Sequence, residues 1–348
     1  MSVKTNGSSP IILFPETREL VKNIQKKTET NNRNNVTRTA AYLSFFHANP
    51  EVHWAFLAHM VSRNGGYQMT DLKGDILPSV LSSKEIDLTF SLLETANAWI
   101  FKDAYPQLLM WEFCKKKKED LFPLLSLFSV SKFMIEKWQQ AFQQEIFPSM
   151  FMTCSLIINE QKMLQTRLLD QSSSYVDLFH SLKYRFQEKM GWTDIVFPKK
   201  TFWKNSLYGI SIDSFLDDRS RIQTGFSLYK LLFQSNDKVA SYLSFATNQP
   251  HTASRQDYWP FHFSSNRQKN NRIFSPSLKH AWEDRSIRPM PTQDWYIPKE
   301  ELLIKDFYEA YTISKNGFNR SRMHKSAWKK KDWLTSYLQY KRKNAPNE

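Results

Sequence analysis

Residues 52–61 read Val52-His53-Trp54-Ala55-Phe56-Leu57-Ala58-His59-Met60-Val61. When successive residues are placed about 100° apart, apolar side chains fall on every side of the predicted helix. A helix that is apolar all round is surrounded by protein, so this stretch predicts a large helical body. We expect Asn49 to cap the helix, Pro50 to take its first position, and Asn64-Gly65 to end it.

The composition favours helices over sheets. The 348 residues include 26 Phe, 14 Tyr and 11 Trp but only 8 Gly. So few glycines leave little material for the tight turns of a hairpin-rich protein. Helical patterns recur along the chain, at 15–31, from Thr37, and at 84–102, 104–118, 121–146, 150–170, 174–190 and 213–234.

We therefore expect an all-α fold: a large, bundle-like body of many helices, wrapped by an irregular segment rich in proline and aromatic residues. The predicted parts are a flexible N-terminus (1–14), the helical body (15–245), the irregular segment packed on it (246–300), and C-terminal helices with a basic tail (301–348). Residues 250–298 hold six of the fifteen prolines together with many aromatic residues. A disordered linker would lack such aromatic residues, so we expect this segment to be ordered.

The chain has the sequence features of a cytoplasmic protein. The apolar patch 11–14 is too short for a signal peptide, and we expect no transmembrane segment, because no apolar run approaches about 18 residues. Cys114 and Cys154 are isolated in the sequence, which predicts two reduced, buried thiols.

The first candidate site follows the apolar helix. His59 and Arg63 lie four residues apart, and Asp71 and Lys73 come after the Gly65-Gly66 pair. A proton-transfer residue, a fixed cation and a glycine loop are what an anionic substrate would need. Alternatively, these are buried polar groups that satisfy one another and hold the loop in place.

The second candidate site lies between two prolines, in residues 250–260. His251, Arg255 and Asp257 stand there among Ser, Thr and Tyr residues. Such density in a loop is typical of functional segments. The alternative is structural, with Arg255 paired to Asp257 or Asp71 and the aromatic rings anchoring the loop.

Other polar groups favour structural roles. No His-Glu-x-x-His occurs, and we expect no metal and no cofactor. We interpret Asp213, Asp217 and Asp218 as a capped, solvated first turn of a helix rather than a carboxylate site. Asn159-Glu160-Gln161 are expected to form a buried hydrogen-bond network, although they could also project into a core site.

Positive charge concentrates at the C-terminal end. The formal net charge is +14, and the last 34 residues contribute +8 of it, from ten Lys and Arg residues against Asp332 and Glu348. Trp and Tyr residues alternate with these lysines, which predicts contact with nucleic acid or an anionic membrane surface, or else a helix packed on the body with solvated lysines. The predicted polyanion-binding residues are Lys325, Trp328, Lys329, Lys330, Lys331, Trp333, Lys341, Arg342 and Lys343.

Several of these stretches resemble an uncharacterised family of domain-of-unknown-function proteins from Bacillus-like spore-forming bacteria. The similar features are His53-Trp54-Ala55, residues 58–67 and 69–73, Asn159-Glu160-Gln161, and residues 251–260. The resemblance implies a cytoplasmic bacterial protein and carries no assigned activity or catalytic residues.

Two functions follow as expectations. The first is a helical binding protein that contacts a polyanion with its basic terminus and a protein partner with its body. The second is an enzyme acting on an anionic substrate at a pocket formed by segments 59–74 and 250–260. In the enzyme, His59 or His251 would transfer protons, and Arg63, Lys73 and Arg255 would hold the anion.

Overall fold

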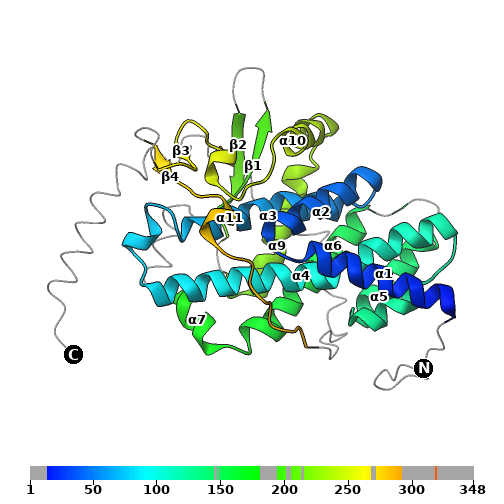
Figure 1. Cartoon of the computed structure of the whole chain (residues 1–348). Helices are drawn as coiled ribbons and strands as arrows, with labels where there is room; N and C mark the ends of the chain where they lie inside the picture. The colour runs from blue at the N-terminus through cyan, green and yellow to red at the C-terminus, as the bar shows by residue number, and fades with distance from the viewer. Residues whose placement is uncertain are drawn as a thin grey trace. The chain divides into compact units, whose positions relative to one another are not determined.

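The computed structural model describes residues 14–144, 147, 149–180, 194–200, 205–212, 215–267, 272–291 and 318–319. It is predominantly helical with short strands, which confirms the predicted fold class (Figure 1). The chain divides into two compact units. The first comprises the described residues within Met1–His59, Thr95–Gln171 and Asp284–Ile313, and the second those within Met60–Glu94, Ser172–Glu283 and Ser314–Glu348.

Two helices contain residues of both units, α3 (His53–Asp71) and α4 (Ser83–Lys117). The other elements of the first unit are helical: α1 (Pro15–Asn31), α2 (Asn35–Ala48), η2 (Phe122–Phe128), α5 (Lys132–Phe142), α6 (Ser149–Leu164) and the π-helical turn η3 (Gln165–Leu169). The expected helices at 15–31 and from Thr37 are confirmed, with Pro15 in the first turn of α1.

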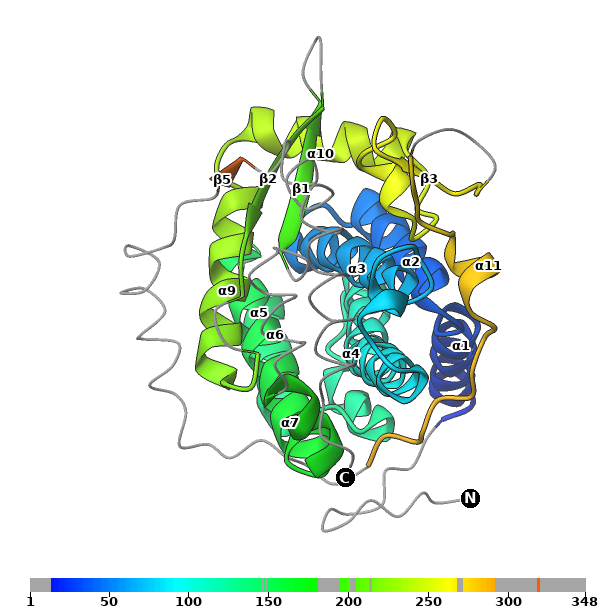
Figure 2. The same ribbon diagram turned by 90° about the vertical axis from the view of Figure 1, so that its left-hand side faces the viewer.

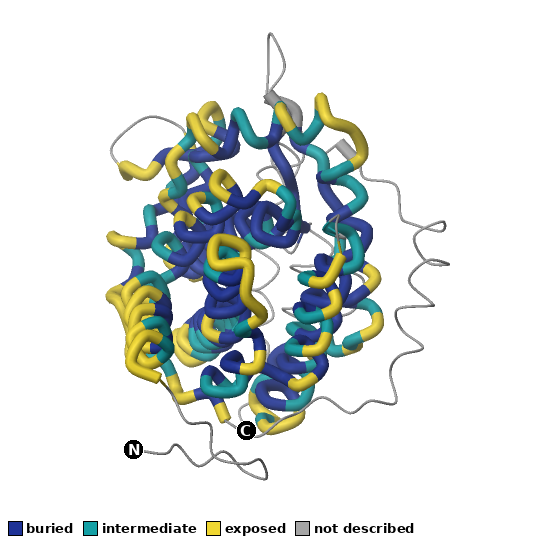
Figure 3. Tube along the Cα trace, turned by 90° about the vertical axis from the view of Figure 1, so that its right-hand side faces the viewer, coloured by how far each residue is buried: buried dark blue, intermediate teal, exposed yellow. Residues whose placement is uncertain are grey.

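Aromatic side chains fill the interior of the first unit. Trp111, Phe122 and Trp138 lie with ring centroids 5.8–6.4 Å apart, and all three are buried. Helices α5 and α6 pack beside one another (Figure 2). The free thiols of Cys114 and Cys154 are buried as predicted, and burial raises the pKa of both. Figure 3 shows buried and exposed residues intermixed along the helices, and in α6 all residues from 152 to 159 are buried (Figure 3).

The second unit combines helices with short strands. Its elements are η1 (Leu77–Ser79), α7 (Ser173–His180), β1 (Ile195–Lys200), β2 (Asn205–Ile210), α9 (Asp218–Leu232), α10 (Asn236–Asn248), η4 (Arg255–Asp257), β3 (Phe263–Ser264), β4 (Ile273–Phe274), α11 (Leu278–Ala281) and β5 (Phe318–Asn319). Strand β2 is central in the order β1-β2-β5, and β3 pairs with β4. Helix α10 packs against β1 and α9 against β2 (Figure 2).

The antiparallel pair β1–β2 was not predicted from the sequence. Its register pairs Ile195 with Ile210 and Val196 with Gly209. A Cβ atom on Gly209 would lie 2.5 Å from the carbonyl oxygen of Ile195, so glycine permits the close approach of the strands. This glycine therefore serves strand packing, a role that no turn signal announces.

Both predicted ends of α3 are wrong. The helix begins at His53 because Asn49 is already the C-cap of α2, with its side chain donating to Phe45 O and accepting from Lys115. It continues through Asn64-Gly65 to Asp71. The predicted break between 102 and 104 is also wrong, because α4 is continuous and contains Pro106. Buried rings at Trp99, Phe101 and Trp111 hold both halves of α4 in place, which offsets the cost of a proline inside a helix.

The described residues that follow α10, 249–267 and 272–291, form short pieces of 3-10 helix, strand and α-helix joined by irregular backbone. Their aromatic side chains Tyr258, Trp259, Phe263 and Trp282 are buried, and Trp282 stacks on Phe90 with ring centroids 3.9 Å apart. Asp217 caps α9 by accepting from Ser220 N at 3.0 Å, which confirms the capping interpretation for this residue. Asp213 and, apart from β5, the predicted C-terminal helices lie outside the described residues. The four predicted domain boundaries stay predictions.

Candidate functional site

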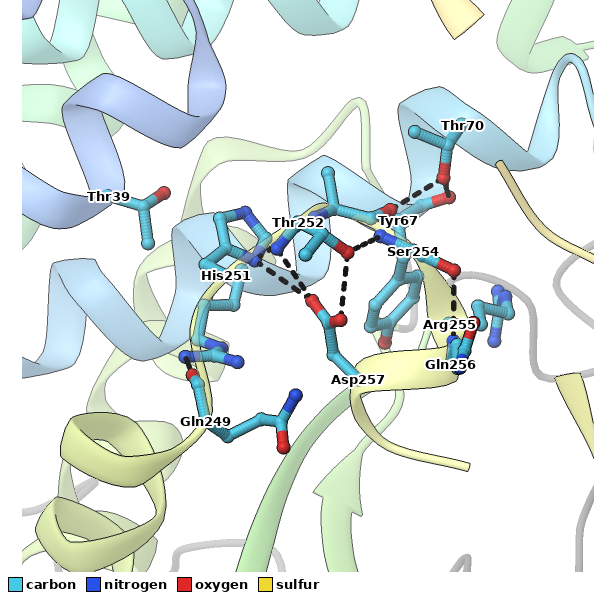
Figure 4. A network of polar contacts seen from close by, with 12 residues as sticks. Thr39, Tyr67, Thr70, Gln249, His251, Thr252, Ser254, Arg255, Gln256 and Asp257 are labelled. Atoms are coloured by element: carbon cyan, nitrogen blue, oxygen red, sulfur yellow. Dashed lines mark hydrogen bonds and ion pairs between the residues drawn. The ribbon is translucent and has the colours of Figure 1, made fainter. Parts of the chain in front are cut away.

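Six of the seven candidate catalytic residues lie in the second unit, and His59 lies in the first. His59 Nδ1 donates to the carbonyl oxygen of Thr39 at 2.8 Å, and the ring is buried. In the second unit, the C-terminal half of α3 and the segment 249–258 meet through hydrogen bonds and an ion pair. Figure 4 shows this network (Figure 4).

Asn64 fixes the C-terminal half of α3 to the sheet. Its side-chain Nδ2 donates to Val196 O at 3.0 Å, and its Oδ1 accepts from Val196 N at 2.8 Å. The hydroxyl of Tyr67 donates to Asn64 Oδ1 and, at 3.2 Å, to Asp194 O. These bonds satisfy a buried amide inside a helix, which explains why Asn64-Gly65 does not end it.

Hydroxyl groups join the segment 249–258 to α3 and to Ser275, the residue that follows β4. Thr70 Oγ1 donates to Ala253 O at 2.6 Å, and Ser254 Oγ donates to Ser275 O at 2.6 Å. Ala253 has a φ of 66°, a left-handed conformation unusual for alanine. The surrounding bonds therefore determine the course of the backbone into η4.

Arg255 and Asp71 form a buried ion pair, which we call the clasp. Arg255 Nε lies 2.8 Å from both carboxylate oxygens of Asp71, and its Nη2 lies 2.7 Å from Oδ2. Their side chains are only 1% and 5% exposed, and the guanidinium lies 4.3 Å from the centroid of the Tyr67 ring. Burial raises the pKa of Asp71 against the opposing effect of Arg255. Burial alone would lower the pKa of Arg255, but the Asp71 carboxylate raises it.

Arg63 is buried in the same unit, and no carboxylate of the described residues forms an ion pair with it. It is 1% exposed, and its Nη1 donates to Gln249 O at 2.9 Å. Its Nε and Nη2 have no hydrogen-bond acceptor in the part of the chain that the structure describes. The guanidinium lies 5.0 Å from the ring centroid of Phe245 and 5.6 Å from that of Tyr258. Such ring contacts contribute about 0.5–2 kcal/mol, less than the several kcal/mol that burying an ion costs.

The charges of Arg63 and Asp257 shift the pKa of His251 in opposite directions. Burial, assisted by the charge of Arg63, lowers the pKa of His251 to about 4, although Asp257 opposes the shift. Its Nδ1 accepts from Ala253 N at 3.4 Å and lies 3.7 Å from Asp257 Oδ2. Asp257 accepts from the backbone N and the Oγ1 of Thr252, both at 2.8 Å. His251 is therefore neutral near pH 7.

A polar pocket of about 840 Å³ opens on this segment. Most of the residues that line it have polar or charged side chains, although slightly more than half of the exposed lining surface is apolar; they are Gln249, Thr252, Gln256, Asp257, Pro260, Ser265, Asn266, Arg267, Ser277 and His280. Of the predicted residues, Asp257 alone is in this lining. Sequence reasoning missed Arg267, Ser277 and His280, which follow the motif in the same proline-rich segment. Their polar density within that segment is the signal that could have found them.

Lys73 differs from the two arginines because it is exposed. Its Nζ lies 4.4 Å from the centroid of the Trp282 ring, and Trp282 Nε1 donates to Met69 O at 2.9 Å. The network thus brings Arg63, Asp71, His251, Arg255 and Asp257 together and leaves Lys73 at the surface.

The first unit contains the network predicted at Asn159-Glu160-Gln161. Asn159 donates to Asp103 Oδ2 at 2.8 Å and accepts from Ser131 Oγ at 2.8 Å. Burial, together with the charge of Asp103, raises the pKa of Glu160 to about 8, against the hydrogen bond from Gln161.

The predicted polyanion-binding residues, Lys325 through Lys343, lie outside the described residues. Among the residues that are described, no helix is both long and apolar enough to cross a membrane. The same residues contain no group of three or more His, Cys, Asp and Glu side chains placed to hold a metal ion.

The sequence of the chain is similar to those of known proteins. Residues 30–329 match the family model described as a protein of unknown function (DUF2515). The chain is 35% identical over 240 residues to the uncharacterized protein YppC of Bacillus subtilis (strain 168), covering 69% of this chain and 73% of that protein. No solved structure matches.

Proposed function

The chain belongs to the DUF2515 family of unknown function, and from this premise we propose that it works in the cytoplasm by binding a polyanion through its basic C-terminal segment. One observation carries the proposal: the last 34 residues hold ten Lys and Arg residues against two acidic ones, which is +8 of the net +14. Such local charge attracts phosphate backbones and releases their counterions on binding.

The described contacts favour binding over catalysis at the two segments that could form an enzyme pocket. Asp71 and Arg255 neutralise each other in the clasp, and Asp257 is held by Thr252. Burial keeps His251 neutral and nearly inaccessible, with a side chain 6% exposed. These groups therefore brace the second unit instead of presenting a cation and a base to a substrate.

Nucleic acid is the partner that the segment fits best. Trp328 and Trp333 flank the run Lys329, Lys330 and Lys331. Indole rings stack on bases, and lysines contact phosphates. An anionic membrane surface would engage the same charges without base stacking. The two partners are therefore separable by experiment.

The test compares the full chain with a version ending at Arg320, which retains β5 and its pairing with β2. Binding of a fluorescent single-stranded oligonucleotide is measured at two salt concentrations, with vesicles of anionic and neutral lipid as parallel samples. The full chain should bind the oligonucleotide with an affinity that falls steeply with salt, and the shortened chain should lose most of it.

A matched charge change sharpens the test. Replacing Lys329, Lys330 and Lys331 by Gln should weaken binding, whereas the same replacement of the exposed Lys22, Lys26 and Lys27 on α1 should leave it nearly unchanged. Equal, salt-insensitive binding by the full and shortened chains would refute the proposal. Binding to anionic vesicles alone would assign the segment to membranes instead.

A further inference from the structure

The two buried arginines of the second unit differ at one edge of the guanidinium group. In Arg255, Nε and Nη2 point along parallel directions and hold the carboxylate of Asp71. In Arg63, the same two nitrogens have no acceptor among the described residues. The two parallel N–H groups on this edge are spaced to donate to two oxygens of one carboxylate or phosphate.

A second buried polar group accompanies Arg63. The Tyr258 hydroxyl is buried, and the described residues offer it no hydrogen bond of normal length and angle. The Arg63 guanidinium is close enough to act on it: burial raises the pKa of Tyr258 to about 12, and the charge and side-chain hydrogen bonding of Arg63 oppose that rise. The Cζ atom of the Arg63 guanidinium lies over the Tyr258 ring, 5.6 Å from the ring centroid. Buried polar groups without good hydrogen bonds are rare in native structures, and two adjacent ones indicate a position for an ordered water, an ion or a polar group of a ligand.

The polar pocket lies next to this pair. Gln249, whose carbonyl accepts from Arg63 Nη1, lines the pocket, and so does Asp257, which precedes Tyr258 in the chain. In Figure 4 the side chains of Gln249 and Asp257, both of which line the pocket, lie on either side of His251, which is not part of the lining (Figure 4). Asp257 directs its oxygens to Thr252, and the exposed Arg267 and His280 add donors at the pocket rim.

We propose that the second unit binds a small anion, through a phosphate or carboxylate group, between the Nε–Nη2 edge of Arg63 and the hydroxyl of Tyr258. The ligand enters from the pocket lined by Gln249 and Asp257, and the half-buried Gln249 side chain moves aside to admit it. Arg267 and His280 contact the remainder of the ligand. This site is independent of the basic C-terminal segment and takes a monomeric anion.

The chemistry of the lining narrows the ligand class. Arg63 supplies two parallel N–H donors and Tyr258 one O–H donor, which together satisfy three lone pairs of an oxyanion. Six amide and hydroxyl side chains of the lining, namely Gln249, Thr252, Gln256, Ser265, Asn266 and Ser277, suit a hydroxylated or amide-bearing body. A small phosphorylated or carboxylated metabolite fits both requirements.

Inorganic phosphate and acetate are the probes for the test. The full chain is titrated with each at constant ionic strength, set with sodium chloride, and the thermal unfolding midpoint and the ³¹P line width of phosphate are recorded. A ligand that binds only the folded state raises the midpoint with concentration. Wild type should show this rise, and the exposed control Arg219→Gln should match it.

Arg63→Gln should weaken the binding by about tenfold or more, because it removes a charged pair of donors. Tyr258→Phe retains the ring and should weaken it by roughly threefold to tenfold through the loss of one donor. The variant with Gln at 329, 330 and 331 should bind as wild type does, which separates this site from the basic segment.

Two results would overturn the inference. One is a wild-type response no larger than the sodium chloride control. The other is unchanged phosphate and acetate binding in Tyr258→Phe or in Arg63→Gln, which would locate the anion elsewhere. Tyr258→Phe keeps the test decisive even when Arg63→Gln does not fold.

Discussion

Arg255 and Arg63 lie in one unit, both almost fully buried and both against aromatic rings, yet among the described residues only Arg255 pairs with a carboxylate. Arg255 holds Asp71 with three short contacts. Arg63 has one carbonyl acceptor and two nitrogens without partners among the described residues. The charge of Arg255 is therefore used to fix the fold, while that of Arg63 remains available.

This difference teaches how to interpret a dense polar motif. Each arginine follows a histidine by four residues, Arg63 after His59 and Arg255 after His251, and nothing in this spacing separates a structural pair from a binding group. Only the contacts of the Nε–Nη2 edge make the distinction. The following predictions test whether that distinction holds, beginning with the largest expected effect.

Asp71→Asn should be the most damaging change, because it leaves the buried charge of Arg255 without its partner. Removing one member of a buried pair costs about 3–5 kcal/mol of the free energy of unfolding. Urea unfolding monitored by tryptophan fluorescence measures it. The exposed Asp237→Asn on α10 is the control, with an expected change under about 1 kcal/mol. A small effect of Asp71→Asn would mean that the clasp is no more structural than Arg63.

His251 should make stability depend on pH, because burial, helped by the charge of Arg63, lowers its pKa in the folded state. The folded-state pKa is about 4 and the ordinary value is 6.5, so between these pH values the unfolded state binds more protons. Stability is then fully present above pH 6.5 and falls as the pH drops towards 4, by up to about 3 kcal/mol.

Urea unfolding at pH 7, 5.5 and 4 for wild type and His251→Gln isolates this contribution, because Glu160 contributes equally to both proteins. Arg63→Met should raise the pKa of His251 and shrink the acid loss. An acid loss of the same size in all three proteins would contradict the predicted coupling.

Asn64 is a buried polar residue without charge, so its removal can be compared with the removal of either arginine. Asn64→Ala should lower the free energy of unfolding by about 1–3 kcal/mol, because Val196 N and O in β1 lose their buried partners. Asn248→Ala, at an exposed amide of α10, should change it by about 0.5 kcal/mol or less. Equal effects of the two changes would show that the Asn64 bonds do not hold α3 to the sheet.

Lys73→Gln should have the smallest effect. Its ammonium group is exposed on the Trp282 ring, where a cation–π contact contributes about 0.5–1 kcal/mol. Thermal unfolding compared with the conservative Lys73→Arg measures it, and the arginine variant should retain the contact. A loss as large as that of Asp71→Asn would place Lys73 among the structural charges.

The sequence predicts the helical body well, because an aromatic-rich and glycine-poor chain with repeated helical spacing has few alternatives. It also predicts the network at Asn159, since three polar residues inside an apolar helix need partners. The predicted end of α3 at Asn64-Gly65 was wrong, because Asn64 makes its hydrogen bonds to β1, more than a hundred residues away. The β1–β2 pair was missed because Gly209 serves close strand contact rather than a turn.

For the candidate site, sequence reasoning identified the two segments and named Asp71 as a possible partner of Arg255. It could not tell Arg63 from Arg255, because the choice depends on which nitrogen meets which carboxylate in three dimensions. The pocket residues Arg267 and His280 stayed outside the prediction for the same reason, since their relation to Asp257 arises only from the fold.

Side-by-side urea unfolding of Arg255→Met and Arg63→Met, in buffer without phosphate or carboxylate, tests the central distinction most directly. We expect Arg255→Met to lose about 3–5 kcal/mol of the free energy of unfolding because Asp71 is left buried and alone, while Arg63→Met stays within about 1 kcal/mol of wild type or exceeds it. Equal losses in the two variants would contradict this expectation.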